Sequence, residues 1–104
     1  IKMEQEVRTV VVINAIPKMD RFEEVIKYFA KLYDIFQNHG ATTIQKLRTS
    51  EQLIGDGGIM ATAVIEFPTK EAIHSALSSS EFSALDNAHE TLYTVFDMRI
   101  CELH

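Results

Sequence analysis

The alternation of hydrophobic and polar positions predicts four strands. Arg8–Ile16 and Ile59–Phe67 are rich in β-branched residues, and a proline follows each of them. Leu92–Leu103 is predicted as the last strand. Thr42–Thr49 is a weaker candidate, because its two apolar members stand three positions apart. We expect a bulge near Lys46 to restore the two-residue alternation there.

A long helix is predicted between the first two strands. Apolar residues recur at helical spacing from Phe22 to Phe36, as in a helix with one buried face. Asp20 is expected to cap its start, with Glu23 three residues later completing a capping box. Gly40 suits the left-handed position that ends such a helix.

A second helix and a short helical segment follow the third strand. Thr69 is expected to cap a helix that continues to Leu77, and Glu81–His89 is expected to form an extra helical segment. The order β-α-β-β-α-β is that of an α+β, ferredoxin-like sandwich, with a four-stranded antiparallel sheet and two main helices on one face. Without linker or repeat, residues 1–104 are expected to form a single domain with its core at about 8–103.

The strands are apolar on both faces, although two helices can cover only one. In the first strand the two faces carry Val10, Val12 and Ile16 against Val11, Ile13 and Ala15. An exposed apolar sheet face of this size is an association surface. The simplest cover is a second copy packed sheet on sheet, so the pattern predicts a homodimer.

Composition supports this interpretation and excludes other classes of protein. The chain has 104 residues, of which 46% are hydrophobic, a generous share for one small core, and this content excludes intrinsic disorder. Its longest apolar run, Val10–Ile13, is far shorter than the roughly 20 residues of a membrane span. The single cysteine, Cys101, fits a reducing compartment, and no signal-like segment opens the chain, so we expect a cytoplasmic protein.

Charge argues against a nucleic-acid or membrane partner. Ten scattered Lys and Arg residues stand against fifteen Asp and Glu, which gives a net charge of −5. RNA-recognition modules share the same element order, but they stack bases on aromatic residues of the third strand. Residues 58–63 contain none.

Four candidate pocket residues lie on the first and last strands. Asp97 and Arg99 stand two apart and are predicted to share a face with Tyr93, so that an acid, a base and a phenol would project into an apolar cavity if that face looks into the dimer. The alternative is an ion pair at a sheet edge or dimer rim. Asn14, a polar residue within the apolar first strand, could orient a substrate carbonyl or be satisfied by neighbouring backbone.

His89 is the fifth candidate, just before the last strand. It could act as a general base or be a solvent-facing loop residue. The four histidines are widely separated, and the chain has neither a His-x-x-x-His nor a Cys-x-x-Cys motif. We therefore expect no metal site and no cofactor.

Three segments carry a resemblance to a known family. They are the strand end and helix start Val64–Ala72, the run Ser79–Leu85, and His39-Gly40-Ala41 after the first helix. Together they resemble the domain-of-unknown-function family 1330 of the dimeric α/β-barrel superfamily, with His89 where that family often has Arg. The resemblance implies a ferredoxin-like fold and a barrel-forming homodimer. Wider relatives include cofactor-independent monooxygenases, muconolactone isomerases and heme-associated proteins.

Two functions remain open from the sequence. The first is binding or conversion of a small molecule in the dimer barrel, monooxygenase-like or isomerase-like by analogy of fold alone. The alternative is a non-catalytic interaction or stress-response module held together by its dimer. No catalytic triad or cofactor motif decides between them.

Overall fold

The computed structural model describes residues 7–103, and its main elements follow the predicted order. The strands are β1 Arg8–Pro17, β2 Thr43–Arg48, β3 Ala61–Phe67 and β4 Tyr93–Leu103. The helical elements are the 3₁₀ turn η1 Met19–Arg21, α1 Phe22–Asn38, α2 Lys70–Leu77, and the one-turn helices α3 Ser80–Ser83 and α4 His89–Leu92. None of the helices in this part of the chain is long and apolar enough to cross a membrane.

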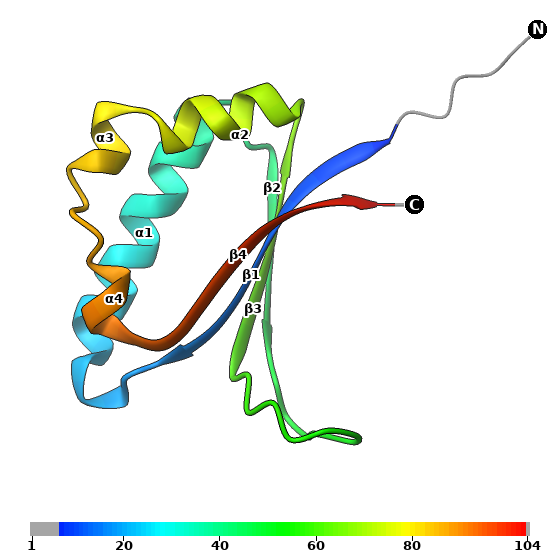
Figure 1. Ribbon diagram of the computed structural model, residues 1–104, viewed down its shortest axis with the longest axis vertical. Helices are drawn as coiled ribbons and strands as arrows, with labels where there is room; N and C mark the ends of the chain where they lie inside the picture. Colours follow the sequence, from blue (N-terminus) through cyan, green and yellow to red (C-terminus); the bar gives the residue numbers. More distant parts are fainter. Residues whose placement is uncertain (1–6, 104) are drawn as a thin grey trace, which may run out of the picture.

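The sheet has the strand order β2-β3-β1-β4, and all neighbours are antiparallel. Figure 1 shows the helices together on one side of the sheet, while the other side carries no helix. β1 is the central partner of both β3 and β4, so Val12 lies between Val64 and Arg99. This is the α+β sandwich that the sequence predicts.

The second helix begins as expected, and the first does not. The Thr69 hydroxyl accepts a hydrogen bond from the Ala72 amide at 3.0 Å, which confirms Thr69 as the cap of α2. At α1 the capping position is Arg21, whose guanidinium binds the Glu24 carboxylate at 2.6 and 3.0 Å instead of the backbone. The prediction that Asp20 caps α1 is wrong, because the 3₁₀ turn absorbs Asp20 and delays the start of the α-helix.

The extra helical segment is split in two. Asp86 and Asn87 both have a φ of 54°, a left-handed conformation that a continuous helix does not contain. The chain therefore leaves α3, turns, and enters α4, which places His89 in the first turn of the new helix.

A bulge occurs in β4 and not in β2. Ile44 pairs with Ile65 and Leu47 with Thr62 in an unbroken register, so the bulge predicted near Lys46 is wrong. Leu47 simply lies on the side away from the helices, where it is 55% exposed. In β4, by contrast, Val95 pairs with Ile16 while Tyr93 pairs with Pro17, which leaves Thr94 without a partner.

The core lies between the helices and one face of the sheet. Leu32 and Phe36 of α1 are fully buried there against Ile65 and Phe67 of β3, and the rings of Phe36 and Phe67 meet edge to face at 5.3 Å. Ile73 of α2 is equally buried. We call the opposite side of the sheet the outer face; in β1 and β3 it carries the alternate residues Val10, Val12, Asn14, Ile16, Thr62 and Val64.

Candidate functional site

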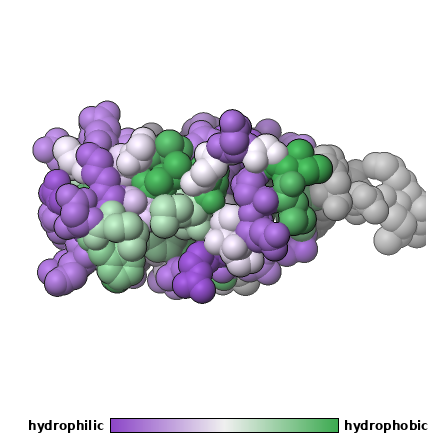
Figure 2. All heavy atoms as spheres, turned by 90° about the horizontal axis from the view of Figure 1, so that it is seen from below, coloured by the Kyte–Doolittle hydropathy of each residue, from purple (hydrophilic) through white to green (hydrophobic). Residues whose placement is uncertain are grey.

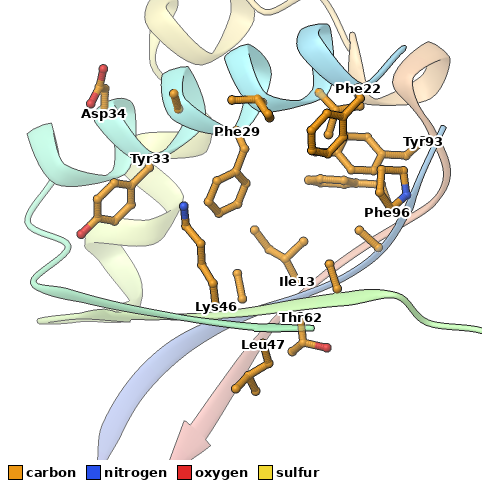
Figure 3. A pocket seen from close by; sticks show the side chains of 17 residues that line it. Ile13, Phe22, Phe29, Tyr33, Asp34, Lys46, Leu47, Thr62, Tyr93 and Phe96 are labelled. Carbon is orange, nitrogen blue, oxygen red and sulfur yellow. The ribbon is translucent and has the colours of Figure 1, made fainter. Parts of the chain in front are cut away.

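A cavity of about 480 Å³ opens between α1 and the sheet, on the helix side (Figure 3). Its floor is formed where small side chains face one another across two strands. Ala15 of β1 pairs with Ala61 of β3, and Ala63 pairs with Ile13. Alanine methyl groups reach less far toward α1 than the larger side chains that fill this layer elsewhere, so they leave space between the helix and the sheet. The three alanines therefore create the depth of the cavity.

One end of the cavity is aromatic. Phe22 of α1 lies there with Tyr93 and Phe96 of β4 (Figure 3). The rings of Tyr93 and Phe96 are 4.8 Å apart, and Tyr28 meets Phe96 edge to face at 5.9 Å. This end of the cavity therefore offers an aromatic, apolar surface backed by packed rings.

The bulge in β4 is what brings Tyr93 into this wall. In an unbroken strand, Tyr93 would share a face with Val95 and Asp97. Because Thr94 is skipped in the pairing, Tyr93 turns to the helix side and is 7% exposed. The prediction that Tyr93 shares a face with Asp97 is therefore wrong, although Tyr93 does line a cavity.

The other end of the cavity carries a cation. Lys46 of β2 extends toward α1 between the rings of Phe29 and Tyr33 (Figure 3), and its Nζ lies 5.1 Å from the centre of the Phe29 ring. Asp34 also borders this end, but its carboxylate points away from Lys46 (Figure 3). Leu47 and Thr62 contribute to the wall from the strands while their side chains point to the outer face.

The mouth of the cavity is bordered by exposed apolar side chains. Phe22 and Ile26 are 48% and 53% exposed, and Met19 next to them is also exposed. Figure 2 shows apolar surface among polar surface at this end of the molecule, where α1 begins. Exposed apolar side chains around a hollow are typical of a ligand site.

Three of the predicted candidates lie on the outer face, away from this cavity. Asn14 accepts a hydrogen bond from the Thr62 hydroxyl at 2.8 Å, so its partner is a side chain of β3 and not neighbouring backbone. Asp97 stands opposite Asn14 in β4, and its carboxylate lies 3.5 Å from Nε of Arg99. Both side chains of this pair are more than half exposed in one copy of the chain. They form a polar group beside the apolar residues Val12 and Val64 of the outer face.

His89 lies behind the aromatic end of the cavity. Its ring is 5.1 Å from Phe96 and 6.5 Å from Tyr28, and its Nδ1 is buried with no hydrogen-bond partner within residues 7–103. His89 is not a solvent-facing loop residue, because it lies in α4 with its ring packed against Phe96 and Tyr28. Burial raises the pKa of both Tyr28 and Tyr93 to about 12, so both phenols remain neutral at physiological pH.

The five candidates thus occupy three places in the fold. Asn14, Asp97 and Arg99 share the outer face, and Tyr93 lines the cavity. His89 lies behind Phe96, a residue of the cavity wall. Lys46 was not among the residues predicted from the sequence. It could have been recognised as a charged residue two positions after Ile44, on the same face of an edge strand. Within residues 7–103 no three His, Cys, Asp or Glu side chains lie close enough together to hold a metal ion.

The fold and the cavity define a ferredoxin-like α+β protein with a small-molecule-sized hollow between its first helix and its sheet. The chain belongs to the domain-of-unknown-function family DUF1330, whose profile matches residues 6–102. No curated protein matches the chain in sequence.

Solved structures with the same fold cover nearly the whole chain. An ethyl tert-butyl ether D (EthD) family protein from Bacillus halodurans has a TM-score of 0.69 at 13% identity, covering 93% of this chain and 99% of its own. A Dabb family protein from Mesorhizobium loti has a TM-score of 0.69 at 13% identity, with coverages of 92% and 96%. A putative antibiotic biosynthesis monooxygenase from Nitrosomonas europaea has a TM-score of 0.68 at 10% identity, with coverages of 98% and 93%. At these identities the likeness is one of fold.

Proposed function

We propose that the protein binds a small, largely apolar molecule in the cavity between α1 and the sheet. The observation that carries this proposal is the cavity itself. Its volume of about 480 Å³ lies within the usual range for small-molecule sites, and its walls are mostly aliphatic and aromatic with a few polar groups at one end. Such a surface gives apolar ligands a place out of water.

Conversion of the bound molecule is the second part of the proposal, by analogy with fold neighbours. One is described as an antibiotic biosynthesis monooxygenase and another as a putative one. The analogy supports monooxygenase-like or isomerase-like chemistry in kind only, because one fold serves many reactions. Tyr33, Asp34, Lys46 and Tyr93 are titratable side chains on the cavity wall.

We also propose that a second copy of the chain covers the outer face. Val12 of β1 and Val64 of β3, which are both only partly buried within one copy, give this face an apolar centre. At its end, Arg8 binds both oxygens of the Glu66 carboxylate at 2.9 and 2.7 Å, which lowers the pKa of Glu66. An apolar centre with a charged rim is the usual anatomy of an interface between two chains.

A neutral fluorescent dye tests the binding site. N-phenyl-1-naphthylamine brightens in apolar surroundings, so it should bind the native protein with a rise in fluorescence. Ala30→Trp, on the α1 wall, should abolish most of that rise by filling the cavity. Lys31→Trp, at the next exposed position and outside the cavity lining, should leave it unchanged. Absence of dye binding to the native protein would refute the proposal and favour the non-catalytic interaction module.

A further inference from the structure

Among the described residues that line the cavity, Lys46 is the one cation, and it suggests what kind of molecule the cavity receives. Lys46 stands on the helix side of the edge strand β2, a position where the core would place an apolar residue. Lys46 pairs across the strands with Ala63 of the cavity floor, so the Lys46 side chain extends along the edge of the cavity. A lysine at this place brings a positive charge to an apolar wall.

No described partner neutralises Lys46. The ion pairs found within residues 7–103 join other side chains, among them Arg8 with Glu66 and Arg99 with Asp97. The ammonium group of Lys46 lies over the ring of Phe29, and Asp34 points away from it (Figure 3). A cation held by a ring retains its charge and its hydrogen-bond donors for another partner.

The rest of the wall fixes the shape of that partner. Phe22, Tyr93 and Phe96 lie at the opposite end, and the alanine floor lies between the two ends. A molecule that fills the cavity would therefore place an apolar or aromatic body against these rings and a polar end at Lys46.

We infer that the ligand is an aromatic or aliphatic acid, anchored by an anionic group on Lys46 with its apolar body in the cavity. This inference rests on the proposed function and adds a ligand class to it. The whole chain carries a net charge of −5, which disfavours anions at its surface generally. A preference for anions must consequently come from a local cation, and Lys46 is the cation on the cavity wall.

Two dyes with the same aromatic frame test this inference. N-phenyl-1-naphthylamine is neutral, and 8-anilinonaphthalene-1-sulfonate adds one sulfonate to it. We expect the sulfonate dye to bind the native protein about fivefold more tightly than the neutral dye, the effect of one exposed ion pair of about 1 kcal/mol. The preference should shrink as salt is raised, since the Debye length falls to about 3 Å at 1 M.

Lys46→Met separates charge from packing. It keeps an unbranched apolar side chain, so it should remove the preference for the sulfonate dye while the affinity for the neutral dye stays unchanged. The matched control is Arg48→Met, which makes the same change of charge on the same face of β2 but outside the cavity lining. It should leave the ratio of the two affinities as in the native protein.

The outcomes distinguish the inference from the proposed function. If neither dye binds the native protein, the proposed function itself fails. If both bind equally, or if Lys46→Met leaves their ratio unchanged, the cavity binds small molecules but the acid inference is overturned. Equal loss of both dyes in Lys46→Met would also overturn it, because Lys46 would then act through packing alone.

Discussion

Val64→Glu should convert the proposed dimer into folded monomers. Val64 lies at the centre of the outer face, paired with Val12 on one side and Gln45 on the other. It is preferable to Val12, because Arg99 stands opposite Val12 and could pair with a new carboxylate there. Beside Val64, by contrast, the outer-face cation Arg8 is already bound to the Glu66 carboxylate.

The magnitude follows from burial of an unpaired charge. An uncompensated carboxylate buried in an interface costs about 3–5 kcal/mol, and two-fold symmetry places two of them in each dimer. The total of about 6–10 kcal/mol would raise the dissociation constant of the dimer by at least about four orders of magnitude. Within one copy Val64 is only half-buried, so the fold should survive the change.

Sedimentation velocity at micromolar concentration measures the outcome. The native protein should sediment as a dimer and Val64→Glu as a monomer with an unchanged far-UV circular dichroism spectrum. Met19→Glu is the matched control, because Met19 is an exposed apolar residue on the helix side; it should remain dimeric. A native monomer, or a dimer that persists in Val64→Glu, would refute the reasoning about the outer face.

Three further predictions concern stability. Thr69→Ala should lower the free energy of unfolding by about 1 kcal/mol in urea titrations, because it removes the cap of α2; no change would show that the cap is energetically idle. Burial raises the pKa of Tyr28 and of Tyr93 from 10 to about 12, so the unfolded chain loses these phenolic protons at lower pH than the folded protein does. The free energy of unfolding should therefore fall as the pH rises from 10 through 12, which thermal denaturation in alkaline buffers measures. A flat profile over that range would contradict their burial. His89→Phe should be neutral or stabilising at pH 8, because a phenyl ring fits the aromatic cluster without an unpaired buried nitrogen; a clear fall in the urea midpoint would imply a hidden partner for Nδ1.

Local signals in the sequence were sufficient for the fold. Prolines limit the first and third strands, helical spacing identifies α1, and the Thr69 hydroxyl caps α2 as its residue type predicts. These features act within a few residues of chain, which is why a single sequence reveals them. The wrong prediction at Asp20 is also local in origin, since a 3₁₀ turn competes with the first turn of α1.

The site depended on features that are not local. Thr94 lies in an alternating segment that fits a regular strand, and only the pairing of Tyr93 with Pro17 and of Val95 with Ile16 shows that Thr94 is skipped. That one bulge separates Tyr93 from Asp97 and moves it into the cavity. Likewise, the alanine floor exists because Ala15 meets Ala61 across two strands that are 46 positions apart in sequence. Small residues on facing positions could have signalled it, once the register was known.

The cavity floor and the outer face are formed by alternate residues of the same two central strands, so ligand binding and dimer formation depend on the same part of the sheet. In β1, Ile13 and Ala15 face the cavity while Val12 and Asn14 face outward. A second copy on the outer face would hold β1 and β3 in one curvature, and that curvature sets the distance from the alanine floor to α1. We therefore expect Val64→Glu monomers to bind N-phenyl-1-naphthylamine more weakly than the dimer. By linkage, saturating dye should strengthen the dimer in proportion to that loss, which sedimentation with and without dye would measure. Equal dye affinity in monomer and dimer would show that the two faces of the sheet act independently.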